Sequence, residues 1–106
     1  MTDRRRTLRA DRAGGYVRVE WATLGADGTL RIEGQSVLSG DQLTGYEWAF
    51  TLPPAQVPAV LAALNADPAD DVLEALQSHC ADHYPPDFIA LFQNHDIEYD
   101  FQSRGD

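Results

Sequence analysis

The sequence predicts an α+β fold in which about three helices pack on one face of a mostly antiparallel sheet. Residues 1–52 repeatedly alternate apolar with polar side chains, a pattern typical of strands that bury one face. At Pro53 and Pro54 the pattern changes to apolar residues at helical spacing, and alternation returns only after Asp96. Because the links between the early strands are short, we expect a four-strand meander, then three helices, then a C-terminal strand that returns to the sheet.

Four strands are expected before the two prolines. A weak first strand at 6–12 precedes Gly14 and Gly15, which tolerate the positive φ of a turn. The clearest strand is 16–24, because its side chains alternate with a period of two. We expect one face of this strand to be buried and the other to face solvent, with Val17, Val19 and Trp21 inside and Arg18, Glu20 and Ala22 outside.

A hairpin turn and a loop flank the third strand. Asp27 and Gly28 predict the tight turn, after which 29–33 forms the strand. Residues 34–43 are rich in Gly, Ser and Asp and are expected to form a loop before a fourth strand at 44–52. Aromatic side chains alternate on three strands and are expected in the helix-facing core, with the polar tips of Trp and Tyr able to rim a partner site: Trp21, Tyr46, Trp48, Phe50, Tyr99 and Phe101.

The first two helices are delimited by proline, asparagine and aspartate. The first begins near Ala55, because Pro58 is tolerated only in a first turn, and Asn65 can end it. Asp67 is expected to cap the second helix, with Pro68 at its first position. Carboxylates near the positive end of that helix would stabilise it, namely Asp70, Asp71 and Glu74.

The C-terminal part is expected to hold one more helix and one more strand. Pro85 and Pro86 stop the second helix, and a short third helix then carries an apolar face and ends around Asn94. The last strand is predicted from alternation, with Ile97, Tyr99 and Phe101 on one side and Glu98, Asp100 and Gln102 on the other.

Charge is distributed very unevenly along the chain. Seven arginines and four carboxylates lie in residues 1–31, which therefore carry a net charge of +3. Residues 32–106 hold one arginine and thirteen carboxylates and carry −12. Such a body repels nucleic-acid phosphates and anionic membranes and attracts basic surfaces. We therefore expect a basic protein partner, and neither a nucleic acid nor a membrane.

The length of 106 residues suits one domain, 1–106, with residues 1–6 as a flexible Arg-rich arm. The arm is expected to pair with the chain's own acidic surface or with a second copy, so a homodimer is an open alternative. No apolar run is long enough for a membrane span, and the N-terminal charges are not followed by the apolar stretch of a secretory signal. We expect a cytoplasmic protein.

His79 and His83 form the sharpest pattern for chemistry. Their i, i+4 spacing places two imidazoles on one helical face, as in zinc sites, and a third ligand could be Cys80, Asp87, His95 or Asp96. However, no glutamate follows the first histidine, and histidines near a helix C-terminus are favoured electrostatically without a metal. A metal-dependent enzyme or metal sensor centred on these two histidines is therefore the alternative function.

Other catalytic arrangements find little support. Cys80 is the only cysteine, so no intramolecular disulfide is possible, and a cysteine beside Leu76 and Ala81 is more often a small core residue than a nucleophile. The sequence contains no Gly-rich phosphate loop, no Gly-x-Ser-x-Gly elbow and no dinucleotide fingerprint. We expect no cofactor and favour a non-enzymatic function.

Three stretches carry a resemblance to a known group: YVRVEWATL (16–24), YEWAFTLPPAQVPAVLAAL (46–64) and IEYDFQSR (97–104). They resemble small acidic proteins of high-GC actinobacteria, and the resemblance implies a compact single domain. In size, acidity and order of elements the chain is also similar to bacterial toxin-immunity proteins.

The main functional hypothesis is a binding module that docks a basic partner through an acidic face. An immunity-type inhibitor of a cationic toxin would be one instance, because complementary charge speeds association. A homo-oligomeric structural protein, in which the arginine arm of one chain meets the acidic body of another, is a third possibility. The carboxylates expected to form the acidic face are Asp70, Asp71, Glu74, Asp82, Glu98 and Asp100.

Overall fold

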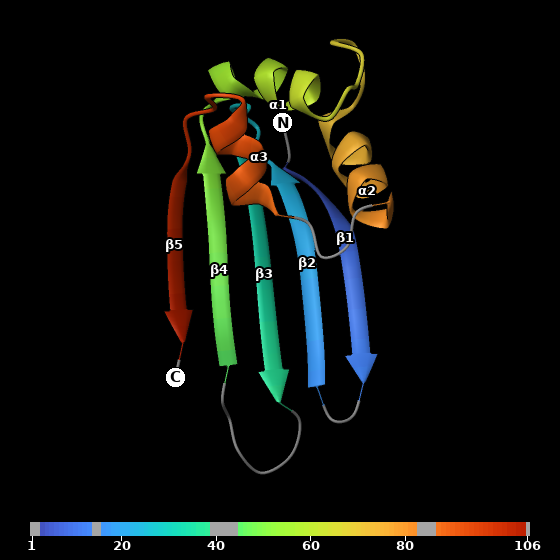
Figure 1. Ribbon diagram of the computed structural model, residues 1–106, viewed down its shortest axis with the longest axis vertical. Helices are drawn as coiled ribbons and strands as arrows, with labels where there is room; N and C mark the ends of the chain where they lie inside the picture. Colours follow the sequence, from blue (N-terminus) through green and yellow to red (C-terminus); the bar gives the residue numbers. More distant parts are fainter. Residues whose placement is uncertain (1–2, 14–15, 39–44, 83–86, 106) are drawn as a thin grey trace.

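A computed structural model describes residues 3–13, 16–38, 45–82 and 87–105, and the side chains among them except those of 11–13, 16, 37–38, 45–46 and 104–105. Within these residues the α+β prediction is confirmed, since three α-helices pack on one face of a five-stranded antiparallel sheet (Figure 1). The elements in chain order are β1 Arg4–Ala13, β2 Tyr16–Leu24, β3 Leu30–Leu38, β4 Gly45–Leu52, the 3₁₀ turn η1 Pro54–Gln56, α1 Val57–Ala63, α2 Val72–Asp82, α3 Phe88–Asn94 and β5 Asp100–Gly105.

The sheet is a plain meander in the order β1-β2-β3-β4-β5. All three helices come between β4 and β5 in the chain, and they gather over the end of the sheet where β2 leads into β3 (Figure 1). Helix α2 lies along β1, and α3 lies over the middle of the sheet (Figure 1). As a result, one face of the sheet is covered by helices, and none of the helices in the described residues lies on the other.

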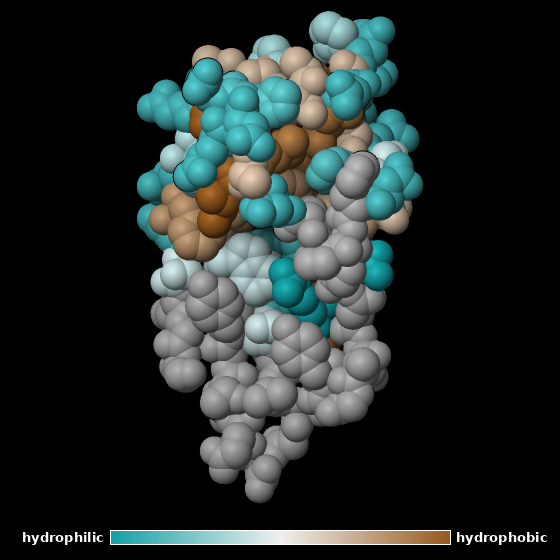
Figure 2. Space-filling view, in the orientation of Figure 1, coloured by the Kyte–Doolittle hydropathy of each residue, from teal (hydrophilic) through white to brown (hydrophobic). Residues whose placement is uncertain are grey.

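The ring of Phe50 on β4 holds α3 and β5 to the sheet. Its centroid lies 6.0 Å from that of Phe88 and 5.6 Å from that of Phe92, both on α3. On the C-terminal side it lies 5.7 Å from Tyr99 and 4.9 Å from Phe101. Tilted and edge-on aromatic pairs of this kind contribute about 0.5–1.5 kcal/mol each beyond the area they bury. In the space-filling view, apolar side chains show through mainly between and beneath the helices, surrounded by hydrophilic ones (Figure 2).

The prediction for the two faces of β2 was wrong. Glu20 is 2% exposed and Ala22 is fully buried on the helix-covered face, whereas Val17, Val19 and Trp21 are only half-buried on the open face. The register explains this, because Ala22 pairs with Ile32 and Ile32 pairs with Phe50, so the three share the face that the helices cover. Alternation alone gives the period of a strand but leaves open which of its faces is buried.

The loop predicted at 34–43 was also partly wrong. Strand β3 continues through Leu38 and pairs with β4, while residues 39–44 lie outside the described part. Gly34 is opposite Trp48, and a Cβ on Gly34 would lie only 2.0 Å from the Cζ2 atom of that indole. This glycine therefore allows a close approach of a ring to the backbone inside a strand, rather than a loop.

The N-terminal arginines belong to the sheet and do not form a free arm in the described residues. Strand β1 starts at Arg4, two residues earlier than expected, and pairs with β2 throughout its length. A β-bulge between Thr7 and Arg9 turns Leu8 into the core, where it is buried.

Two of the predicted helix ends agree with the structure, whereas the first helix, expected near Ala55, begins at Val57 after a 3₁₀ turn. Asn65 ends the first helix with a φ of 59°, and α3 ends at Asn94 as predicted. Helix α2 begins at Val72, so Asp67 does not cap it, and the expected stop at 85–86 lies outside the described residues. Strand β5 begins at Asp100, because the N–H of Ile97 binds the carbonyl of Phe92 at 2.9 Å and closes α3 instead. No helix among the described residues has the length and apolar character needed to cross a membrane.

Substitution of Gly34 tests the contact between β3 and β4. We expect Gly34→Ala to destabilise the protein by about 1–3 kcal/mol, because its Cβ would displace the Trp48 ring. The measurement is urea unfolding of four proteins: wild type, Gly34→Ala, Trp48→Val and the double variant. The loss caused by the alanine should largely vanish when Trp48 is already valine. Gly25→Ala is the control, because its Cβ would come no closer than 3.0 Å to any atom, against 2.0 Å at Gly34. If Gly34→Ala lowered the free energy of unfolding equally in the wild type and in Trp48→Val, the contact would be contradicted.

Candidate functional site

A groove of about 440 Å³ runs between the α1–α2 connection and the outer side of α2. Four of the six carboxylates expected to form an acidic face line it. The complete lining is Leu64, Asn65, Ala66, Asp70, Asp71, Glu74, Ala75, Ser78, His79 and Asp82.

The helical repeat of α2 brings these side chains together. Asp71, Glu74, Ser78 and Asp82 are spaced by three or four residues, which places them along one face of a helix. The opposite face is apolar and packs on the sheet through buried residues: Val72, Leu73, Leu76 and Cys80. Burial of that apolar stripe therefore fixes the acidic side of α2 outward. The small residues Ala75 and Ser78, which the sequence reasoning missed, leave the space between the carboxylates open.

The connection before α2 is a turn held by aspartates. An oxygen of Asp67 accepts a hydrogen bond from the N–H of Ala69 at 2.9 Å, and Asp70 accepts one from the N–H of Asp67 at 3.0 Å. Asp71 caps α2, since its carboxylate accepts from the N–H of Leu73 at 2.9 Å. The predicted capping role of Asp67 thus belongs to Asp71, because the chain makes this extra turn before the helix starts.

Two arginines of β1 reach the groove from the sheet. Arg4 forms a hydrogen-bonded ion pair with Asp71. Arg6 donates to the side-chain oxygen of Gln77 at 3.1 Å and lies 3.9 Å from the carboxylate of Glu74. The expectation that the basic segment pairs with the acidic surface of its own chain is therefore met by these contacts.

The environment of Asp71 lowers its pKa below the ordinary value of 3.8. Partial burial acts to raise this pKa, but it is outweighed by the hydrogen bonds from Arg4 and from the N–H of Leu73 and by the charges of Arg4 and Arg6. Asp70 and Asp82 differ from Asp71, because no ion pair joins either of them to an arginine in the described part of the chain.

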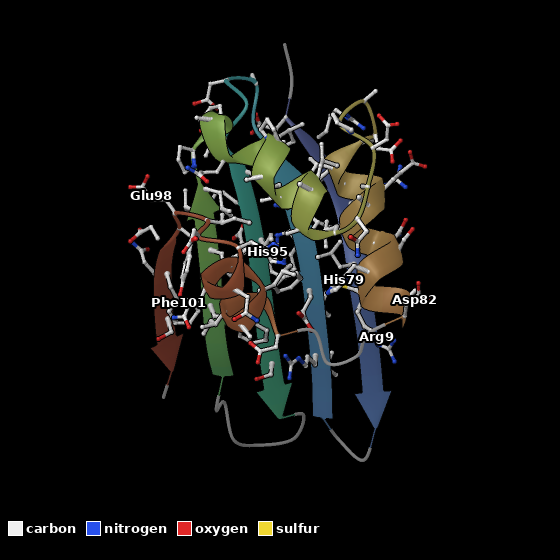
Figure 3. The ribbon with its side chains drawn as sticks, turned by 45° about the horizontal axis from the view of Figure 1, so that its top comes forward. Arg9, His79, Asp82, His95, Glu98 and Phe101 are labelled. Carbon is white, nitrogen blue, oxygen red and sulfur yellow. The ribbon has the colours of Figure 1, made fainter. Side chains whose placement is uncertain are left out.

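Glu98 and Asp100 do not belong to this groove. Asp100 is the first residue of β5 and Glu98 precedes it, while α2 lies along β1 at the opposite edge of the sheet. Figure 3 shows Glu98 and Asp82 on opposite sides of the molecule. The six carboxylates therefore form two separate groups, one of four and one of two.

No family model, characterised protein or solved structure matches the chain.

The pattern around His79 does not assemble a metal site in the described residues. His79 is half-buried with its ring 6.3 Å from that of Phe88, and its partner in the predicted pair, His83, lies outside the described part. Among the described side chains no three of His, Cys, Asp and Glu lie close enough together to hold a metal ion.

Cys80 is placed as a core residue. It is fully buried, and burial together with the negative charge of Glu20 raises the pKa of its thiol to about 12, against a smaller opposing effect of Arg9. At neutral pH the thiol stays protonated, so the side chain is a poor nucleophile.

The sequence reasoning missed a buried ion pair on β2. Glu20, which was expected to face solvent, accepts a hydrogen bond from the Nε of Arg18 at 3.2 Å. The guanidinium of Arg18 in turn lies over the ring of Trp48, 4.9 Å from its centroid. The positive charge of Arg18 and its hydrogen bond to Glu20 offset the unfavourable burial of the Glu20 carboxylate, and the Trp48 ring holds the guanidinium in place. The sequence contains a signal for this pair, because two opposite charges at i and i+2 of a strand lie on the same face.

Loss of the Arg4 side-chain charge tests the electrostatics of the groove. We expect Arg4→Met to raise the pKa of Asp71, because a hydrogen bond and a positive charge are removed. In the wild type, the stability that ionised Asp71 contributes is present above its unfolded pKa and is lost as pH falls through the lower folded pKa. In the variant this loss should occur at higher pH.

The measurement is an NMR titration of the side-chain carboxyl carbons in both proteins. Asp27, whose pKa is lowered chiefly by the hydrogen bonds from the N–H and the side chain of Thr29, is the internal control and should titrate identically in both. An unchanged titration of Asp71 would show that Arg4 does not act on it.

Proposed function

We propose that this protein is a non-enzymatic binding module that docks a basic protein partner in the acidic groove of α2. The observation that carries the proposal is the grouping of Asp70, Asp71, Glu74 and Asp82 on one groove. Only two arginines, Arg4 and Arg6, pair with this group in the described residues, so negative charge remains for a partner.

Asp82 supports a binding role in particular. It lies one helical turn beyond Ser78 on the outer face of α2 and lines the groove. It is also exposed and has no arginine partner in the described part of the chain. Its charge is therefore available to a cationic partner.

The net charge of the chain favours a partner with a basic surface. Outside the N-terminal 31 residues the net charge is −12, which would steer a cationic protein toward the groove over distances of about 8–10 Å at moderate salt. The active sites of nucleases are basic, so an immunity-type inhibitor of a cationic toxin is one form that this function would take.

The experiment first isolates the partner and then compares matched variants. Affinity purification from the native host at low salt, read by mass spectrometry, should recover a stoichiometric basic protein that about 0.5 M salt releases, because salt screens exposed charges. Binding of that partner is then measured by calorimetry to wild type, to Asp70→Asn/Glu74→Gln/Asp82→Asn and to the control Glu98→Gln/Asp100→Asn. Asp71 is left intact, because it caps α2.

We expect the groove variant to bind at least roughly tenfold more weakly and with a flatter dependence on salt, since three exposed charges each contribute up to about 1 kcal/mol. The control should bind nearly as the wild type does. The proposal fails if both variants lose affinity equally, or if the wild-type affinity does not depend on salt.

A further inference from the structure

The open face of the sheet carries a row of side chains that the strand register aligns across five strands. Thr7 pairs with Trp21, Trp21 with Glu33, Glu33 with Ala49, and Ala49 with Gln102. Neighbouring members of such a row lie about 4.8 Å apart, and the next residues on the same face follow about 6.8 Å along each strand. The row therefore crosses the middle of the face on which none of the described helices packs.

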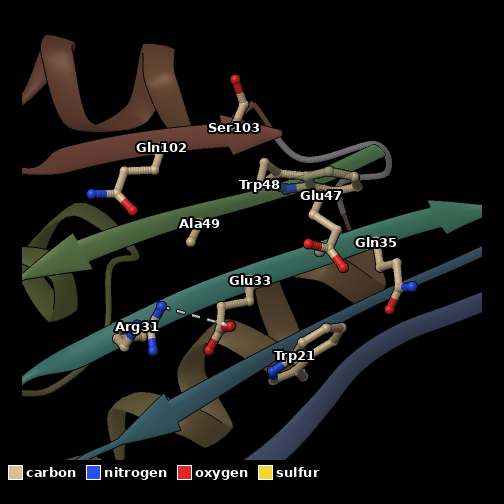
Figure 4. A pocket seen from close by; sticks show the side chains of 10 residues that line it. Trp21, Arg31, Glu33, Gln35, Glu47, Trp48, Ala49, Gln102 and Ser103 are labelled. Carbon is tan, nitrogen blue, oxygen red and sulfur yellow. Dashed lines mark ion pairs between the residues drawn. The ribbon is translucent and has the colours of Figure 1, made fainter. Parts of the chain in front are cut away.

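Ala49 makes a hollow in this row, because it is the smallest side chain between larger ones. The hollow measures about 510 Å³, within the range of small-molecule sites. Figure 4 shows Glu33 and Gln102 on the strands flanking Ala49, with Trp21 beyond Glu33. Trp48 also borders the hollow, but its ring lies over Gly34 on the helix-covered face. The remaining lining residues are Arg31, Gln35, Glu47 and Ser103.

Packing of the hydrophobic core does not explain why Trp21 lies on this face. It is half-buried on the side away from the helices, and its indole N–H is closed to solvent with no hydrogen-bond partner in the described part of the chain. An unsatisfied buried donor is unfavourable, so a residue without it would suit a purely structural position better. We take the indole as an apolar wall for a ligand.

The charged side chains around the hollow are of both signs, which favours a neutral ligand over an ionic one. Glu33 and Glu47 would repel phosphates and carboxylates. Arg31 lies 3.8 Å from Glu33 and partly neutralises it, and one face of the Trp21 ring already has Arg5, 5.6 Å from its centroid. A purely apolar ligand is disfavoured because half of the lining residues carry a carboxylate, amide or guanidinium group.

We propose that this hollow binds a neutral polyhydroxylated ligand such as a sugar unit. Hydroxyl groups both donate and accept, so they match a lining in which Glu33 and Glu47 accept, Arg31 donates and Gln102 does both. The C–H side of a sugar ring matches the apolar surface of Trp21 and Ala49. This site lies on the face opposite the helices, so it is independent of the acidic groove and of the function proposed for it.

The test is an ¹H–¹⁵N NMR titration of the full chain with D-glucose, D-galactose, D-mannose, N-acetyl-D-glucosamine and myo-inositol. We expect at least one of these to shift the indole signal of Trp21 and the amides of Glu33, Ala49 and Gln102 in a saturable way. The indole signal of Trp48 should stay in place, because that ring is on the other face.

Two variants and one control make the test specific. Glu33→Gln should weaken binding roughly tenfold, the usual effect of a lost hydrogen bond to a charged group. Ala49→Ile should abolish the shifts by filling the hollow, and its position on the open face of β4 suits a β-branched residue. Glu98→Gln, a carboxylate outside the hollow, should bind as the wild type does. Well-dispersed amide spectra of each variant show that it is folded.

Several outcomes would overturn the proposal. One is that none of the five compounds shifts the NMR signals of the residues in the row. Another is that Ala49→Ile leaves the shifts intact. Equal shifts with arginine or with inorganic phosphate would show an ionic site instead. A dimer in sedimentation that Ala49→Ile dissociates would assign this face to a second copy of the chain.

Discussion

A chain of contacts across β2, β3 and β4 decides which face of the sheet is buried. The ring of Trp48 occupies the space that a side chain at Gly34 would need, Arg18 lies over that ring, and Arg18 pairs with Glu20. All of these groups are on the helix-covered face. Because side chains alternate along a strand, Trp21 must then point to the other face, and the hollow over Ala49 follows from the same register.

The acidic groove depends on this arrangement as well. Arg4 and Arg6 pair with Leu24 and Ala22 in the register of β1 with β2, so their side chains share the face on which α2 packs. They reach Asp71, Glu74 and Gln77 from the sheet and tie α2 to β1. The fold thus uses part of the negative charge for its own stability and leaves the rest, at Asp70 and Asp82, at the surface.

Local features of this fold were predictable from sequence, and long-range ones were not. The bounds of β2, the end of α1 at Asn65 and the end of α3 at Asn94 follow from periodicity and from residue-specific backbone preferences. The buried face of β2 could not be predicted, because both of its faces include apolar side chains and only the pairing of Ala22 with Ile32 selects one. Likewise, the segment that begins at Gly34 has the composition of a loop. The role of this glycine, which is to admit the Trp48 ring, can be seen only from the pairing of the two residues.

The candidate site shows the same division. The convergence of Asp71, Glu74 and Asp82 follows from helical spacing, which the sequence contains. The separation of Glu98 and Asp100 from them follows from the strand order, which places β5 and β1 at opposite edges and has no local signal. The hollow on the open face combines residues from four strands, and it could be identified only after the faces were known.

The most direct test of this account is a NOESY spectrum that locates the two tryptophans. The ring protons of Trp48 should give strong NOEs to the α-protons of Gly34, and Trp21 should give NOEs to side chains of Arg5 and Glu33. NOEs between Trp21 and the rings of Phe50 or Phe92 would place Trp21 in the core and contradict the assignment of the two faces.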